Sequence, residues 1–232
     1  MNGILLVDKP AGWTSFDVVN YVRRSVANSL GKRPKSLKVG HTGTLDPFAT
    51  GLLVLLIGKE YTKQATLLSR LDKSYEVSMI LGKSSTTGDP EGEISFISDR
   101  RPKLGELEAV LKRFEGQIEQ TPPKYSAIKI NGQRAYRLAR NGEEVVIKPR
   151  QVTIRRLKLT NYDYPNAYLT TDVSSGTYIR ALVEDIAKNL QTVAYTSALR
   201  RTKVGQFSLI DAVSMENISP EVIAKNLKQS LE

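Results

Sequence analysis

The chain has 232 residues, of which 34 are Lys or Arg, 24 are Asp or Glu, one is His and none is Cys, so its formal net charge is +10. The lack of Cys excludes zinc ribbons, thiol redox centres, Cys nucleophiles and disulfide scaffolds, and a single His excludes a multi-histidine metal site. Any catalysis must therefore use carboxylates, hydroxyls, Lys, Arg or a cofactor, in a chain whose 40% hydrophobic content is typical of a folded protein.

The first third of the chain predicts a strand, a helix, a long loop and a second strand. After a β-type run at residues 4–7, Thr14 or Ser15 can cap a helix whose apolar residues repeat at helical spacing until Gly31 ends it. The elements expected next are a loop rich in Gly and Thr at 40–51, a buried strand at 52–57, a helix at 62–71 and a strand at 74–81.

The rest of the chain mixes helical patterns with hairpin signals. A loop rich in Gly, Ser and Thr at 82–92 comes first, and Asn131-Gly132 is a strong tight-turn signal. Helices are expected at 104–114, 134–140 and 178–190, and strands at 145–148, 152–161 and 168–173. Helices and hairpins together favour a mixed sheet with flanking helices over a purely parallel sheet.

No repeat or low-complexity linker marks a domain boundary, so one large domain is expected. The longest apolar run, at 52–57, is far too short to cross a bilayer, and the first residues lack the pattern of a signal peptide. The sequence therefore predicts a cytoplasmic protein without a membrane segment.

The excess positive charge is concentrated in one segment. Residues 124–158 hold ten basic side chains against two acids, which places +8 of the net +10 in this stretch. Tyr125 and Tyr136 are interleaved with the basic residues, and such a pattern suits a polyanion with stackable bases. The segment predicts a nucleic-acid surface, with a solvated basic face as the alternative. The acid-rich stretch 89–119 is expected to face away from nucleic acid.

Residues 38–52 form the densest candidate site. Their three glycines allow close approach of a ligand to the backbone, and Asp46, followed by the rigid Pro47, is their only carboxylate. A second cluster at 174–180 places Arg180 near a helix start, where its guanidinium could keep a carboxylate ionised. A turn-capping Asp and a surface Arg are the alternatives for these two residues.

The sequence Lys-Val-Gly-His-Thr-Gly-Thr-Leu-Asp-Pro-Phe-Ala-Thr-Gly-Leu at 38–52 closely resembles the tRNA pseudouridine synthase B family, which isomerises uridine 55 in the T arm of tRNA. The start of the chain matches too, with Gly-Ile-Leu-Leu-Val-Asp-Lys-Pro-Ala-Gly-Trp-Thr-Ser at 3–15. Further blocks resemble the family at 121–140, 175–182 and 199–207. Together the blocks cover most of residues 3–207 in the expected order.

The resemblance implies the catalytic fold of pseudouridine synthases, an α+β fold with a mixed, largely antiparallel central sheet and flanking helices. The catalytic domain is expected at 1–210. Residues 211–232 are expected to form a short helix or tail in place of the PUA-type RNA-binding extension that is usual in the family. This early end predicts weaker binding to whole tRNA and recognition confined to the T arm. The expected state is a monomer that needs no metal and no cofactor.

The resemblance also implies roles for individual residues. Asp46 is the essential carboxylate, acting either as a nucleophile at the sugar or as a base at C2′. Tyr75 is expected to stack on the base and assist deprotonation at C5, and Arg180 is expected to pair with Asp46. The target uridine is expected to flip out of the T loop. His41 is then expected to contact RNA in the vacated space, with a bond to the loop backbone as the alternative.

The other residues expected to bind substrate or RNA come from the same matched blocks. Ile179 and Leu199 are expected to line the uracil pocket, although plain core packing is the alternative for both. The full set besides His41 is Lys9, Gly43, Thr44, Tyr125, Lys129, Arg140, Tyr178, Ile179 and Leu199. Tyr125, Lys129 and Arg140 lie in the basic segment that would follow the RNA backbone. Tyr178 fits a base contact and a buried position equally well.

Two other functions compete with the isomerase. A non-catalytic protein that binds the T arm or acts as an RNA chaperone would carry the same basic segment, but the presence of Asp46, Tyr75 and Arg180 disfavours it. A base-excising glycosidase is disfavoured because such enzymes ordinarily use two carboxylates, and the matched blocks at 38–52, 121–140, 175–182 and 199–207 contain no acid besides Asp46.

Overall fold

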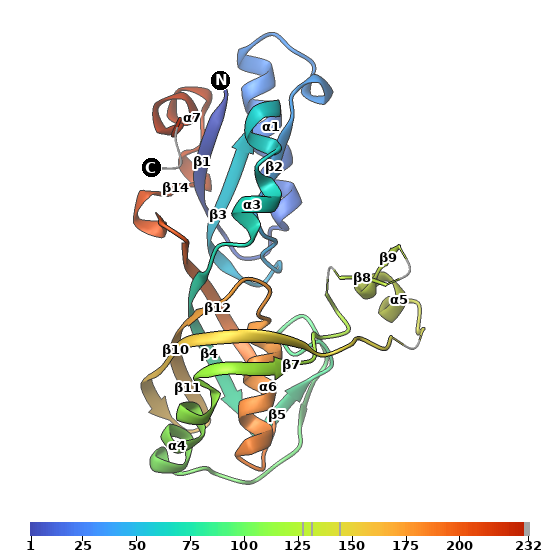
Figure 1. The fold of residues 1–232 in the computed structure, drawn as a ribbon, viewed down its shortest axis with the longest axis vertical. Helices are drawn as coiled ribbons and strands as arrows, with labels where there is room; N and C mark the ends of the chain where they lie inside the picture. The colour runs from blue at the N-terminus through green and yellow to red at the C-terminus, as the bar shows by residue number, and fades with distance from the viewer. Residues whose placement is uncertain (127, 131, 144, 230–232) are drawn as a thin grey trace. The chain divides into compact units, whose positions relative to one another are not determined.

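The computed structural model describes residues 1–126, 128–130, 132–143 and 145–229. The chain divides into two compact units. Unit 1 comprises Met1–Tyr75 and Leu199–Glu232, and unit 2 comprises Glu76–Ala198. Unit 1 is therefore built from both ends of the chain and unit 2 from its middle, as the colours of Figure 1 show. Strands β4 (Lys73–Leu81) and β12 (Ala194–Val204) contribute residues to both units.

Unit 1 is organised around two strands that are buried except at Asp8 and Thr50, β1 (Gly3–Lys9) and β3 (Thr50–Ile57). They pair antiparallel, and the local strand order is β14-β1-β3-β12. The short strand β2 (Val39–His41) pairs with β3, β13 (Phe207–Ser208) pairs with β12, and β14 (Val213–Ser214) runs parallel to β1. Because side chains alternate along a strand, β1 sends Leu5 and Val7 into one apolar cluster and Ile4 and Leu6 into another.

Helix α1 (Ser15–Ser29) covers the first of these clusters with Val18, Val19, Val22 and Val26. Its predicted start is confirmed, since the Thr14 hydroxyl accepts the Asp17 N–H while the Asp17 carboxylate accepts the Thr14 N–H, a reciprocal capping box. The remaining helices of unit 1 are α2 (Lys59–Thr62), α3 (Ala65–Ser69) and α7 (Pro220–Asn226), with 3-10 turns at Pro34–Ser36, Leu209–Asp211 and Met215–Asn217.

Unit 2 has the strand order β12-β4-β11-β10-β7. The long hairpin of β10 (Arg150–Asp163) and β11 (Asn166–Val173) is antiparallel, as is the pair of β10 with β7 (Gly116–Gln120). Its main helices are α4 (Leu104–Phe114) and α6 (Ile179–Asn189). Two small hairpins pair β5 (Lys83–Ser85) with β6 (Ile94–Phe96) and β8 (Lys129–Ile130) with β9 (Gln133–Arg134). Figure 1 shows β8, β9 and α5 (Ala135–Arg140) standing away from the sheet of unit 2.

The predicted fold class, α+β with a mixed and largely antiparallel sheet, is confirmed. Strands β1 and β14 pair in parallel, as do β3 and β12. Several local predictions are wrong. The helix expected at 62–71 is two short helices, residues 145–148 are not a strand, and part of the loop expected at 82–92 is strand β5. Strand β12 was not expected, and Asn131 of the predicted tight turn lies outside the described residues. In the part of the chain that is described, no helix combines the length and apolarity needed to span a membrane.

Candidate active site

The loop that carries Asp46, residues 42–49 between β2 and β3, is called here the Asp46 loop. It is fixed through the two residues beside Asp46. The Ser15 hydroxyl donates to the Leu45 carbonyl at 3.0 Å and accepts the Leu45 N–H at 2.8 Å. On the other side, the Pro47 carbonyl accepts the Gly12 N–H at 2.9 Å and the Lys9 ammonium at 3.1 Å. Leu45 is 3% exposed, whereas Asp46 is half-buried. The backbone at Asp46 is thus held on both sides, while the residue itself is only half-buried.

Arg201 of β12 bonds to the backbone near both ends of this loop. Its guanidinium donates from Nε to the Leu52 carbonyl at 2.8 Å and from Nη2 to the Gly43 carbonyl at 3.0 Å. The residue is 1% exposed, so these bonds are made away from water, where an unmet donor or acceptor is costly. Gly51, with φ +99°, pairs with Arg201 in the β3–β12 register, and a Cβ there would collide with the Arg201 backbone.

Lys73 is a second buried cation beside Gly43. A Cβ on Gly43 would lie 3.6 Å from both the Lys73 Cε and the Arg201 Nη1, so the two cations flank this glycine. The Lys73 ammonium donates to the carbonyls of Ser69 and Leu71 at 2.9 and 2.6 Å. Burial, reinforced by the Arg201 charge, lowers the pKa of Lys73 from 10.5 to about 8. Sequence patterns missed both cations as parts of the loop support, because charged side chains are normally expected at the surface.

His41 faces the same loop as a neutral imidazole. Burial, followed by the nearby Arg201 charge, lowers the pKa of His41 below its usual value of 6.5. Its Nδ1 accepts the Gly43 N–H at 3.3 Å, so the proton of the neutral ring lies on Nε2. His41 thus makes the bond to the loop backbone that the sequence left as its alternative role, and keeps one ring donor for other contacts.

The other predicted residues of unit 1 have different settings. Lys9 is completely buried and also donates to the carbonyls of Pro10 and Trp13 at 2.9 and 2.7 Å. This geometry favours support of the loop over a direct contact to RNA. Thr44 is exposed, while Tyr75 and Leu199 are each 8% exposed on β4 and β12.

Unit 2 fixes Arg180 by a buried ion pair that the sequence did not indicate. Arg180 Nη1 lies 2.8 Å from an Asp89 carboxylate oxygen, and the two side chains are 4% and 3% exposed. The same guanidinium donates to the carbonyls of Thr87 and Tyr125 at 2.8 and 2.7 Å. Asp89 belongs to the acid-rich stretch that was expected to face away from nucleic acid, and its carboxylate is buried against Arg180. Its place in the turn Thr87-Gly88-Asp89-Pro90, where its Oδ1 also accepts the Glu91 N–H, is the local signal.

The start of α6 places three predicted residues together in unit 2. Tyr178 is the N-cap, and its backbone N–H and carbonyl both bond to the side-chain amide of Gln120, at 2.8 and 3.1 Å. The Arg150 guanidinium lies 4.9 Å from the Tyr178 ring centre, a cation–π contact, and it also donates to the Gly176 carbonyl. Ile179 is 4% exposed and Arg180 follows it directly.

The basic segment of unit 2 presents its cations to solvent. Lys129 on β8 and Arg140 at the end of α5 are exposed, and Tyr125 is half-buried. Arg140 lies 5.8 Å from the Tyr136 ring centre. The interleaving of rings and cations expected from the sequence is therefore present at this surface.

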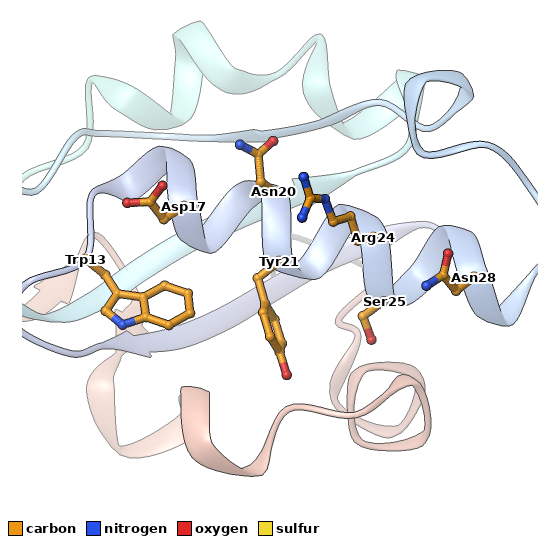
Figure 2. Close-up of a pocket in the computed structure, with 7 residues that line it drawn as sticks. All are labelled: Trp13, Asp17, Asn20, Tyr21, Arg24, Ser25 and Asn28. Carbon is orange, nitrogen blue, oxygen red and sulfur yellow. The ribbon is translucent and has the colours of Figure 1, made fainter.

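A separate hollow of about 580 Å³ runs along one side of α1 (Figure 2). Trp13 and Tyr21 meet there edge to face, with ring centres 6.0 Å apart. One acid and one base, Asp17 and Arg24, line it with Asn20, Ser25 and Asn28. Asp46 is not in its lining. Among the described residues, no group of three or more His, Asp or Glu side chains is placed to hold a metal ion.

Family models and known proteins match this chain over most of its length. Residues 30–179 match the family model described as TruB family pseudouridylate synthase (N terminal domain), and residues 180–232 match the model described as tRNA pseudouridylate synthase B C-terminal domain. The chain is 46% identical over 220 residues to tRNA pseudouridine synthase B of Pseudomonas fluorescens (strain Pf0-1), covering 94% of this chain and 68% of that protein. It is 40% identical over 220 residues to the Borreliella burgdorferi (strain ZS7) protein of the same name, covering 94% and 75%.

Among solved structures, the crystal structure of a Cbf5-Nop10-Gar1 complex superimposes with a TM-score of 0.70 at 26% identity. The match covers 93% of this chain and 53% of that one, so the chain spans about half the length of that structure. The family match extends over more than half of the chain, and the blocks that carried the sequence resemblance lie largely within it. The chain therefore belongs to the TruB family of pseudouridine synthases, which are isomerases.

Proposed function

We propose that this isomerase converts uridine 55 in the T arm of tRNA to pseudouridine, with Asp46 as its catalytic carboxylate. The observation that carries the proposal is the position of Asp46 between Leu45 and Pro47, both of which are bonded to the frame of unit 1. A carboxylate whose backbone is fixed in this way can meet a sugar in one orientation, which removes much of the entropic part of the barrier. The names of the relatives, tRNA pseudouridine synthase B, support tRNA as the substrate.

The reaction is an isomerisation, so every heavy atom of the uridine is retained and one proton is exchanged for another. The bond from C1′ to N1 breaks, the uracil turns, a bond from C1′ to C5 forms, and the C5 proton leaves for solvent while N1 gains one. Asp46 can serve this sequence by bonding to C1′ or by taking a proton from C2′. Deuterium at C2′ would slow only the second route, and this separates the two.

Arg180 and Tyr75 complete the proposed active site. Arg180 is the proposed partner of the Asp46 carboxylate, and its ion pair with Asp89 supports one fixed orientation of the guanidinium. Tyr75 is proposed to stack on the uracil, and Ile179 and Leu199 are proposed to contact the same base.

The T arm is the proposed RNA partner, and the uridine is proposed to flip out of its loop. The exposed cations of the basic segment, including Lys129 and Arg140, supply charge for the RNA backbone. His41 is neutral, so its proposed contact with RNA in the vacated space is a hydrogen bond from Nε2 rather than an ion pair.

The decisive experiment uses an unmodified T-arm hairpin with tritium at C5 of uridine 55 only. Release of tritium by the unsubstituted chain, and none by Asp46→Asn, is the expected result. Asp99→Asn is the matched control, because Asp99 is exposed. A second hairpin labelled only at uridine 54 should release nothing. Binding without release would leave the chain as a T-arm RNA-binding protein and overturn the proposal.

A further inference from the structure

The segment from α1 to β2 of unit 1 carries a charge that the proposed site does not use. Residues 18–45 contain six cations and no Asp or Glu, although 28 residues would hold about three acids at the average of the chain. Five of the six, Arg24, Lys32, Arg33, Lys35 and Lys38, are exposed. Within the described chain, none of the six has a carboxylate at ion-pair distance. Like charges gathered without acids repel one another, so a merely solvated face would favour mixed signs.

An exposed aromatic ring lies two residues before this stretch, next to Asp17, whose carboxylate is bonded to Thr14 in the helix cap. Phe16, in the first turn of α1, is 60% exposed, and the Arg23 guanidinium lies 5.9 Å from its ring centre. Arg23 is held in place, since it donates to the Asn20 side chain at 2.8 Å and to the Val39 carbonyl at 3.0 Å. A ring beside a fixed guanidinium is a surface on which an unpaired base can stack.

This surface adjoins the Asp46 loop. Ser15, the residue before Phe16, makes both bonds to Leu45, and Arg23 bonds to Val39 at the start of β2. Strand β2 ends at His41, and the Asp46 loop follows directly. RNA bound with its target uridine at Asp46 would therefore pass close to these side chains.

We propose that Phe16, Arg23, Lys32, Arg33, Lys35 and Lys38 form a second RNA-contact surface, called here the α1–β2 surface. It takes an unpaired base on Phe16 and backbone phosphates on the cations of residues 32–38. This inference rests on the proposed function, because it assumes that RNA reaches Asp46. It is distinct from the basic segment of unit 2, since the two surfaces share no residue.

The test measures binding of the T-arm hairpin to the full chain as a function of salt, in the Asp46→Asn background so that no turnover occurs. The variant Arg33→Gln with Lys35→Gln is compared with Lys112→Gln with Arg113→Gln on α4, where the same two exposed residue types are neutralised. The first pair should weaken binding about tenfold and reduce the slope of log K against log salt by about 1.5, or 0.7 to 0.9 for each lost phosphate contact. The control pair should keep the slope.

The aromatic part is tested separately. Phe16→Ala should weaken binding about tenfold, and Phe16→Trp should preserve it, because stacking needs a ring rather than that particular side chain. Unchanged affinity and slope in the Arg33/Lys35 pair, with unchanged affinity in Phe16→Ala, would overturn the inference. Tritium release by the unsubstituted chain is measured in parallel. If release occurs and these variants bind normally, only the α1–β2 surface fails; if no release occurs, the proposed function fails instead.

Discussion

The Asp46 loop of unit 1 and residues 124–149 of unit 2, the part of the basic segment that precedes β10, are both expected to meet RNA, yet they are held in opposite ways. The loop is bonded to distant, buried parts of unit 1 through Ser15, Lys9 and Arg201. The described residues of the segment bond mainly to one another, as Ala135 does to Ile128 at 2.8 Å, apart from the Tyr125 carbonyl that accepts from Arg180. The proposed reaction requires a carboxylate fixed to within fractions of an ångström, whereas contacts with the RNA backbone require positive charge at the protein surface.

The largest effect is expected from Asp89→Asn, which removes the charge facing buried Arg180 and with it the support of the segment at Tyr125. Breaking a buried ion pair costs about 3 kcal/mol of unfolding free energy, and tritium release should fall as well. Chemical denaturation measures the first quantity. Asp172→Asn is the control, since its partner Arg156 is half-exposed and the loss should stay below about 1 kcal/mol. Equal losses in both variants would contradict the role given to Asp89.

Ser15→Ala tests the Asp46 loop with a smaller change. It leaves the N–H and the carbonyl of buried Leu45 without the hydroxyl, at a cost of about 1–3 kcal/mol. Because Asp46 is the next residue, kcat should fall more than KM rises. Ser36→Ala removes an exposed hydroxyl bond to Arg33 and should change stability by less than about 0.5 kcal/mol. A Ser15 variant with normal kcat would show that the loop does not need this anchor.

Lys73→Met tests the charge beside the loop through pH. The folded-state pKa of about 8 lies below the unfolded value of 10.5, so between these values the unfolded chain binds the extra proton. Raising the pH from 7 to 9.5 should therefore stabilise the unsubstituted chain relative to Lys73→Met by about 1–2 kcal/mol. Denaturation midpoints at several pH values measure this difference. A difference that stays constant with pH would exclude the lowered pKa.

The smallest effect on stability is expected from the exposed cations of the basic segment. Lys129→Gln and Arg140→Gln should each leave the unfolding free energy within about 0.5 kcal/mol. Each should nevertheless weaken T-arm binding and reduce the salt slope by about 0.7 to 0.9. Lys188→Gln, on an exposed position of α6, serves as the control. A large loss of stability would show that the segment is held more firmly than its described contacts indicate.

Local patterns predicted the parts of the fold that local forces decide. Helix α4 has the bounds read from its apolar spacing, and the Thr14 cap of α1 depends only on residues within one turn. Strand β3 was predictable because a run of six apolar residues can only be buried. The helix expected at 62–71 failed because helical spacing there continues across Lys63 and Gln64, where the chain turns between α2 and α3.

The parts that were missed depend on partners far along the chain. Strand β12 contains polar residues in most of its second half, and its strand state comes from pairing with β3 and β4. Lys9 and Arg201 are buried because backbone carbonyls from other segments receive their donors. Asp89 lies in an acid-rich stretch, and the partner that accounts for its burial, Arg180, comes 91 residues later. Motif matching placed Asp46 in a candidate site, but it could not show what holds Asp46 there.

The bonds from Arg201 also determine when the Asp46 loop can be completed during synthesis. They reach back 149 residues to Leu52 and 158 residues to Gly43. A ribosome releases the loop long before it makes β12, and contacts over such separations form slowly. The nascent chain therefore carries Asp46 for most of its synthesis without the cation that fixes both ends of its loop. The loop reaches its final geometry only after residue 201 has been added and has entered the sheet beside Gly51.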